Sequence, residues 1–348
     1  MNYSNLKTVR DLSLDVDGIC RAIALTQNRD GEIPWHIGGK TDPWDHVEAA
    51  MGLTVGGYYE QARKAYRWMT AMQRPDGSWY AAYIDGRPED KTLDANFTSY
   101  IAVGVFHHYL ITGDISFLEE MWPTVASAVD FALDLQAQGG EIHWAVSPEG
   151  RIDPMALLTG SCSVYMSLKC ALLMARQLGC ETHRWTSGLS RLENAIRYKP
   201  HLFNITKSRF SMDWFYPVLT GVLTENRARQ RIRQHWRKFV VNGQGVKCVS
   251  DEPWVTLAET AELVLALAAM EDRRLAETVF GWILDKQFDD GTFWCGYTYP
   301  DMVVWPEEKI TWTNAVILLA ADALYHLTPA GQLFRHDFWR GKLESGSP

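Results

Sequence analysis

The sequence predicts an all-α fold, an (α/α)6 barrel in which six helical hairpins form a toroid of about twelve helices. Three observations predict it: a turn motif that recurs along the chain, an alternation of amphipathic and wholly apolar segments, and a length of 348 residues, which divided by six leaves 58 for each hairpin. Because no segment rich in Pro, Ser or Gly divides the chain, we predict a single barrel domain over residues 1–330 and a C-terminal tail over 331–348.

The recurring turn consists of Gln, two further residues, Asp or Gly, then Gly, with an aromatic residue shortly afterwards. It occurs as QNRDGEIPW (27–35), QRPDGSWY (73–80), QAQGGEIHW (136–144) and QFDDGTFW (287–294). Asp-Gly and Gly-Gly favour the left-handed backbone conformation that commonly ends a helix. We therefore expect each turn to close a helix, with the glycine supplying the C-cap.

The segments between these turns alternate in character. Residues 58–72, 225–238 and 271–287 are amphipathic, and 225–238 holds seven charged residues of fourteen, as in helices with one face in solvent. Residues 95–113, 159–178, 255–270 and 311–327 are apolar nearly all round, as in helices enclosed by others. Strand-like pieces are short, at 78–84 and 292–299. The alternation predicts helices, outer and inner in turn, near 12–28, 44–57, 58–73, 94–112, 114–138, 157–178, 183–198, 212–223, 225–241, 255–270, 272–287 and 309–327.

Composition excludes several classes of protein. The net charge of −8 gives no basic surface for a polyanion, so we expect no nucleic-acid partner. The first residues contain no apolar signal region, and the longest uncharged stretch, 95–113, contains two His with Asn, Ser and Thr, so we expect no membrane partner. Six scattered Cys without a CxxC pair indicate free thiols and a cytoplasmic protein.

Six short segments begin the predicted inner helices and should meet at one end of the barrel: 41–48, 93–100, 159–165, 211–217, 251–262 and 305–314. Most combine a carboxylate with aromatic residues, and their one Lys or Arg is Lys309. Acidic residues in a first helical turn are often caps. Asp45, Glu48, Glu259 and Glu262 lie further inside apolar segments, where an unpaired carboxyl is expected to have a raised pKa and to suit a general acid.

Paired carboxylates beside aromatic rings predict glycoside cleavage, in which one group protonates the leaving oxygen and the other acts on water or carbon. We predict no cofactor and no metal site. Two alternatives remain open: isoprenoid chemistry of the terpene cyclase or prenyltransferase kind on the same barrel, and a non-catalytic sugar-binding protein. The 15 Trp fit an aromatic sugar-binding rim. Nine lie near inner-helix starts, of which we expect the turn residues Trp79, Trp144 and Trp294 to be structural; the others are Trp35, Trp44, Trp214, Trp254, Trp305 and Trp312.

Two resemblances concern parts of the chain. The Gln-x-x-Asp-Gly turns are similar to those of terpene cyclase and protein prenyltransferase barrels, but the sequence has no D-x-D-D motif, and Asp289-Asp290 leads into Gly-Thr-Phe instead of completing D-D-x-x-D. The segment WPEEKITWTNA (305–315) resembles the glucoamylase family, which implies that Glu307 is a general base.

Longer strings, DPWDHVEAAMGL (42–53), MDWFYPVL (212–219), PWVTLAETAELVLAL (253–267) and WPEEKITWTNAVILLAADAL (305–324), resemble a bacterial (α/α)6-barrel family often labelled prenyltransferase-like, which includes mycobacterial methylmannose polysaccharide hydrolases. The resemblance implies an endo-acting α-1,4-mannosidase on mannose- or glucose-type glycans, O-methylated or not, which inverts with its carboxyl groups roughly 6.5–9.5 Å apart. It implies Asp45 and Glu259 as the catalytic pair, with Glu307 as a third candidate, and substrate contacts from Asp42, Trp44, Glu48, Asp94, Tyr100, Asp213, Trp214, Tyr216, Trp254, Glu262 and Trp312.

Overall fold

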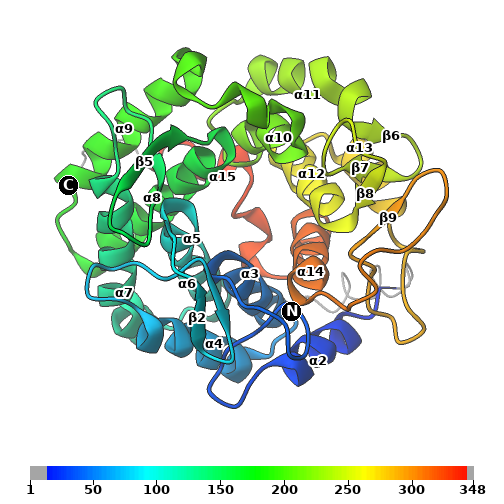
Figure 1. The fold of residues 1–348 in the computed structure, drawn as a ribbon, viewed down its shortest axis with the longest axis horizontal. Helices are drawn as coiled ribbons and strands as arrows, with labels where there is room; N and C mark the ends of the chain where they lie inside the picture. Colours follow the sequence, from blue (N-terminus) through cyan, green and yellow to red (C-terminus); the bar gives the residue numbers. More distant parts are fainter. Residues whose placement is uncertain (1–13, 343–348) are drawn as a thin grey trace.

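In the computed structural model, which describes residues 14–342, six buried helices form a closed inner ring. Each inner helix packs against the next, and α14 packs against α3 to close the ring (Figure 1). The inner helices are α3 (Pro43–Val55), α6 (Ile101–Thr112), α8 (Leu158–Leu178), α10 (Ser211–Leu219), α12 (Leu257–Ala269) and α14 (Thr311–Tyr325). This arrangement confirms the predicted (α/α)6 barrel.

One outer helix packs against each inner helix, with α2 against α14 and the others against the inner helix that precedes them. The outer helices are α2 (Val16–Thr26), α4 (Tyr59–Met72), α7 (Ile115–Asp134), α9 (His183–Tyr198), α11 (Glu225–Phe239) and α13 (Arg273–Gly281). All twelve predicted helices are therefore present, although residues 12 and 13 of the first lie outside the described part. The predicted helix 94–112 is divided at Tyr100 into α5 (Ala95–Ser99) and α6.

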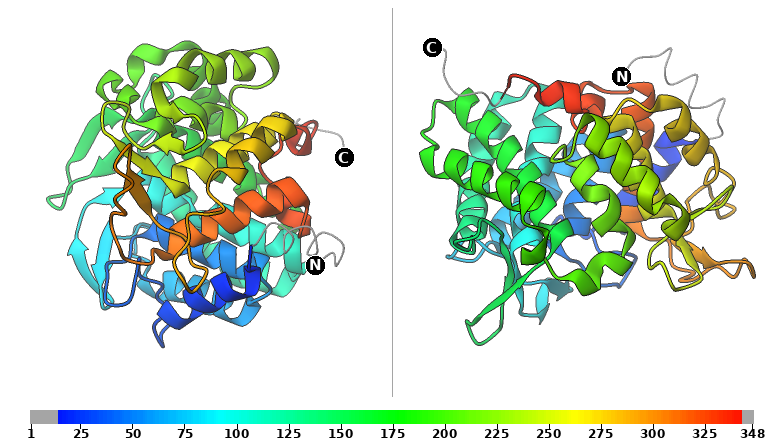
Figure 2. Two further views of the ribbon diagram at one scale, coloured as in Figure 1. Left: turned by 90° about the vertical axis from the view of Figure 1, so that its right-hand side faces the viewer. Right: turned by 90° about the horizontal axis from the view of Figure 1, so that it is seen from above.

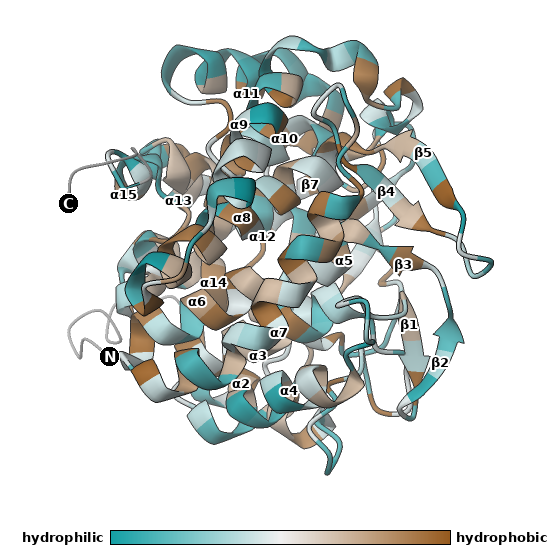
Figure 3. Cartoon of the chain, turned by 90° about the vertical axis from the view of Figure 1, so that its left-hand side faces the viewer, coloured by the Kyte–Doolittle hydropathy of each residue, from teal (hydrophilic) through white to brown (hydrophobic). Residues whose placement is uncertain are grey.

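Burial separates the two rings as the sequence pattern predicts. In α3 every residue except Asp45 is buried, whereas in α11 only Ala228, Ile232 and Phe239 are. Their spacing of four and seven places these three on one face of α11, while hydrophilic residues cover the outward face (Figure 3). Helix α8 is long and apolar enough to cross a membrane, but 78% of its most apolar window is buried inside the barrel.

The recurring turns correct the C-cap prediction. Gln27, in an extended conformation, is the C-cap of α2, and the left-handed residue is Gly31, four positions later, with φ 108°. The side-chain amide of Gln27 donates to the Gly31 carbonyl at 3.0 Å and to the Gln61 carbonyl of the next outer helix at 2.9 Å. The turns at Gln73 and Gln136 repeat this pair of bonds. In each, the Gln amide donates to a carbonyl of its own turn and to a carbonyl of the next outer helix, α7 for Gln73 and α9 for Gln136.

Only glycine fits these turns, because the backbone of the next outer helix lies against them. A Cβ at Gly77 would lie 2.3 Å from the Ser127 carbonyl oxygen, so this turn docks one hairpin onto the next. The fourth turn differs, since Gln287 donates to the Leu284 carbonyl and Gly291 faces open space.

Short antiparallel strands occupy connections from an outer helix to the following inner helix. They form three sheets, β1 (Ala82–Ile84) with β2 (Arg87–Asp90), β3 (Leu93–Asp94) with β4 (His143–Val146) and β5 (Ile152–Ala156), and β6 (Val240–Val241) with β7 (Gly245–Lys247), β8 (Trp254–Thr256) and β9 (Gly296–Thr298). They project from the barrel end where the inner helices begin (Figure 2). The sequence indicated the regions of β1 and β9 but not the rest.

Short helical elements complete the structure: η1 (Pro200–Leu202), η2 (Ile205–Arg209), η3 (Pro329–Gln332) and α15 (His336–Trp339). Helix α15 lies at the barrel end opposite the strands, with Phe338 and Trp339 buried (Figure 2). Of the predicted tail, residues 343–348 lie outside the described part of the chain.

Candidate active site

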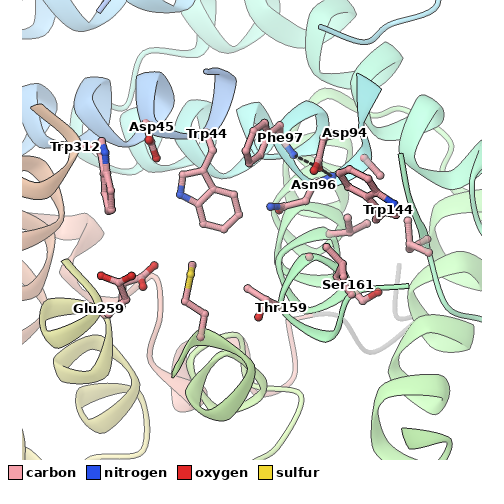
Figure 4. Close-up of a pocket in the computed structure, with 17 residues that line it drawn as sticks. Trp44, Asp45, Asp94, Asn96, Phe97, Trp144, Thr159, Ser161, Glu259 and Trp312 are labelled. Carbon is pink, nitrogen blue, oxygen red and sulfur yellow. Dashed lines mark hydrogen bonds between the residues drawn. The ribbon is translucent and has the colours of Figure 1, made fainter. Parts of the chain in front are cut away.

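A cavity of about 360 Å³ lies at the barrel end where the inner helices begin (Figure 4). Its walls come from the start of five inner helices, from α5 and from the region of β4, so the segments predicted to meet do meet. The residues that line it are Trp44, Asp45, Asp94, Ala95, Asn96, Phe97, Ile142, Trp144, Leu157, Thr159, Gly160, Ser161, Val164, Met212, Glu259, Glu262 and Trp312.

Asp45 and Glu259 point into this cavity from opposite sides, near the start of α3 and of α12 (Figure 4). Asp42 caps α3 by accepting the Asp45 backbone N–H at 2.9 Å, which fixes the first turn that carries the Asp45 side chain. Asp45 is half-buried, and its desolvation among the cavity walls, followed by the nearby carboxylates of Asp42 and Glu48, raises its pKa well above the usual range. This rise favours the protonated form of Asp45.

A second pair of carboxyl groups lies one helical turn deeper, because Glu48 and Glu262 follow Asp45 and Glu259 by three residues. The Tyr100 hydroxyl donates to Glu48 Oε1 at 2.9 Å, and the Tyr216 hydroxyl donates to Glu262 Oε1. Burial raises the pKa of Glu48 to about 8, against the hydrogen bonds from Tyr100 and Trp44.

The pKa of Glu262 is also raised well above its usual range, by burial first and then by the charges of Glu48 and Glu259. Both shifts favour the neutral form of these deeper carboxyl groups. Glu262 lines the cavity, whereas Glu48 does not.

Trp44 forms the centre of one cavity wall and is held from behind. Its indole stacks on the Tyr100 ring, with centroids 4.1 Å apart and planes 2° from parallel, and lies 5.9 Å from the Tyr216 ring. Tyr100 and Tyr216 do not line the cavity. We predicted that these two tyrosines contact the substrate. In the structure they instead lie behind the cavity wall, where each orients a buried Glu and the Trp44 ring.

Two other predicted carboxylates act within the fold. Asp42 accepts the Trp35 indole N–H at 2.8 Å in addition to its capping bond, so both of its oxygens are engaged outside the cavity. Asp213 accepts both the backbone N–H and the hydroxyl of Thr159, at 3.2 and 2.6 Å, and thereby ties α10 to α8. Neither lines the cavity.

Asp94 caps α5 and also lines the cavity. It accepts the backbone N–H groups of Asn96 and Phe97 at 2.7 and 3.0 Å (Figure 4). Burial raises its pKa to about 7 even though these bonds oppose the rise.

Three predicted site residues lie elsewhere. Trp214 is buried on the outer side of α10, where its ring stacks on Phe239 at 5.3 Å and its N–H donates to the Arg231 carbonyl at 3.0 Å. Trp254 lies in β8 and donates to the Trp305 carbonyl at 2.9 Å. Glu307 is exposed in a different depression, which it shares with residues of α2 and with Lys309. The sequence placed these residues near the starts of inner helices but did not reveal the direction in which each side chain points.

The structure adds cavity residues that sequence reasoning missed. Asn96, Phe97, Thr159, Ser161 and Met212 belong to the predicted opening segments, but carboxylates and Trp give the stronger sequence signal, so these types were passed over. Trp144, which we expected to be structural, lines the cavity as Trp44 and Trp312 do. Trp79 is a core residue, as expected, with its N–H bonded to the Met69 carbonyl at 2.8 Å.

Residues 14–342 contain no group of three His, Cys, Asp or Glu side chains arranged to hold a metal ion. The chemistry that the cavity itself offers is that of two facing carboxyl groups between aromatic walls. This combination on an (α/α)6 barrel defines a glycoside hydrolase.

Comparison with known proteins agrees with this class. No family model matches the chain. The chain is 50% identical over 315 residues, 90% of its length and 87% of the relative's, to the MMP endo-(1,4)-3-O-methyl-alpha-D-mannosidase of Mycolicibacterium hassiacum. The chain belongs to the family of that enzyme and is a glycosidase. This membership decides against the isoprenoid and the non-catalytic alternatives.

Solved structures share the fold at low sequence identity. The GH63 mannosylglycerate hydrolase from Thermus thermophilus, in complex with Tris and D-glycerate, matches with a TM-score of 0.69 at 11% identity, over 87% of this chain and 99% of that one. A wild-type glycosidase matches with a TM-score of 0.70 at 13% identity, over 94% of this chain and 100% of that one. These likenesses establish the barrel.

Proposed function

We propose that this chain hydrolyses internal α-1,4 linkages between 3-O-methylmannose units of a polysaccharide. The observation that carries the proposal is the facing pair Asp45 and Glu259 in a cavity walled by Trp44, Trp144 and Trp312. The 50% identity to an enzyme named for this linkage and this methylated sugar supports the choice of substrate. The six free cysteines support a cytoplasmic location.

In the proposed mechanism Asp45 is the general acid and Glu259 the general base. The raised pKa of Asp45 supports this assignment, because an acid must hold its proton until the glycosidic oxygen takes it. The C–O bond to the leaving sugar breaks as that oxygen accepts the Asp45 proton. On the opposite face of the ring, Glu259 accepts a proton from the water whose oxygen bonds to the anomeric carbon, and the configuration inverts.

The assay is the release of reducing ends from 3-O-methylated α-1,4-mannooligosaccharides, with unmethylated mannooligosaccharides and α-glucan as comparison substrates. We expect Asp45→Asn and Glu259→Gln each to lower kcat by about 10²- to 10⁴-fold. Full activity in both variants would refute the assignment.

An aryl glycoside with an acidic phenol separates the two roles, since its leaving group needs no proton. On this substrate Asp45→Asn should recover most of its lost rate, whereas Glu259→Gln should not. If only Glu259→Gln recovered its lost rate on this substrate, Glu259 would be the general acid and Asp45 the general base.

A further inference from the structure

The cavity has two chemically different ends (Figure 4). Asp45, Glu259 and Trp312 lie at one end, where the bond is cleaved under the proposed function. Trp144 and Ser161 lie at the other end, away from the catalytic pair, and Thr159 lies between the two ends. A sugar unit bound across the catalytic end would extend part of itself, or a neighbouring unit, toward this far end.

One face of α8 forms a wall of the far end. Ser161 and Val164, three residues apart, lie on the same face of α8, and Leu157 is the extended residue that precedes the first turn of the helix; all three line the cavity. We call this the Ser161 face. Ile142, which is 2% exposed, adds a further apolar side chain to the same cavity.

Ser161 is the polar group of this face, and its hydroxyl is unused by the protein. The residue is 2% exposed, and its Oγ is buried without a hydrogen-bond partner. A serine in a helix commonly bonds the carbonyl four residues earlier, and Ser161 makes no such bond. A buried hydroxyl without a partner is unfavourable, so this group is suited to donate to a ligand atom in the cavity.

Two neighbouring polar groups are partly engaged, while Asn96 Oδ1, on the α5 wall beside Gly160, is buried without a hydrogen-bond partner. The Thr159 hydroxyl donates to Asp213, and Asp94 accepts two backbone N–H groups of α5. A sugar hydroxyl turned toward the Ser161 face, away from Asn96, would find Ser161 on one side and Leu157 and Val164 on the others, and would lose part of its hydration.

We propose that the Ser161 face is the subsite that recognises a sugar O-methyl group. The Ser161 hydroxyl donates to the ether oxygen, which can accept a hydrogen bond but cannot donate one, and Leu157 and Val164 contact the methyl group. The inference rests on the proposed function and adds to it the residues that distinguish a methylated from an unmethylated glycan. A single methyl group in an apolar pocket commonly changes kcat/KM by about 10- to 200-fold.

The test compares kcat/KM on 3-O-methylated and unmethylated α-1,4-mannooligosaccharides of equal length. Val164→Thr keeps the shape of the side chain and replaces one methyl with a hydroxyl. Its matched control is Val316→Thr, the same change at a buried valine of α14 that does not line the cavity. Ser161→Ala removes the proposed donor in a way that the fold should tolerate.

The wild type should prefer the methylated glycan by at least about tenfold. Val164→Thr should lower this preference at least about fourfold, the value of one buried methyl group, and Val316→Thr should leave it unchanged. Ser161→Ala should lower kcat/KM on the methylated glycan by about two- to tenfold. An active Val164→Thr enzyme with an unchanged preference, or a Ser161→Ala enzyme with wild-type kcat/KM, would overturn this subsite alone. A wild-type enzyme inactive on both glycans would instead overturn the proposed function.

Discussion

Replacing Glu48 by Gln tests whether the deeper carboxyl group of Glu48 is buried as a neutral acid. The change keeps the size of the side chain and an oxygen that accepts from the Tyr100 hydroxyl. The pKa of Glu48 rises on folding from 4.5 to about 8. Between these two pH values the folded chain holds one proton more than the unfolded chain, so the free energy of unfolding falls as the pH rises. The difference of 3.5 pH units, at about 1.4 kcal/mol each, corresponds to about 5 kcal/mol.

Glu48→Gln removes this dependence, since an amide does not titrate. The free energy of unfolding, measured by urea titration, should therefore be similar for wild type and variant near pH 4.5 and higher for the variant by about 5 kcal/mol at about pH 9. Glu119→Gln, a change at an exposed residue of α7, is the control and should leave the pH profile as it is. A variant that is equally or less stable than wild type in the alkaline range would refute the argument that Glu48 is buried as a neutral acid.

Two further predictions separate cavity residues from residues that lie elsewhere. Trp312→Leu should lower kcat/KM with little loss of stability, because Trp312 lines the cavity. Trp214→Ala should instead lower the free energy of unfolding by about 3–5 kcal/mol, because Trp214 is a packed core residue. Denaturant titration and kinetics on the same preparations check both predictions. Glu307→Gln should keep kcat close to that of wild type, since Glu307 is exposed outside the cavity, and a loss approaching that of Glu259→Gln would contradict this.

The fold was predictable because the spacing of apolar residues in each helix shows whether one face or the whole surface is buried. Helix α14 is apolar nearly all round and α11 has a single apolar stripe through Ala228 and Ile232, so their inner and outer places follow from periodicity. The sheets were not predictable in this way. Leu93 pairs with Val146 across more than fifty residues in strands of two and four residues, which are too short to show an alternating pattern.

The site was predictable in part for a related reason. A carboxyl inside an apolar helix stands out, and this signal located Asp45, Glu259 and Glu262, all of which line the cavity. The same signal did not give side-chain direction. Trp214 adjoins Asp213 in sequence, but successive helical residues point about 100° apart, and the Trp214 ring packs outward against Phe239. Ser161 and Val164 carry no distinctive signal, because only the tertiary structure shows that their face of α8 borders a cavity.

The most direct test of the central claim is proton NMR of the first products from a 3-O-methylated α-1,4-mannooligosaccharide, recorded during hydrolysis by the wild-type enzyme. With Asp45 as acid and Glu259 as base acting through water, new reducing ends should appear first in the β configuration, and the product lengths should report cleavage of internal linkages. New reducing ends that appear first in the α configuration, or no new reducing ends at all, would contradict the account.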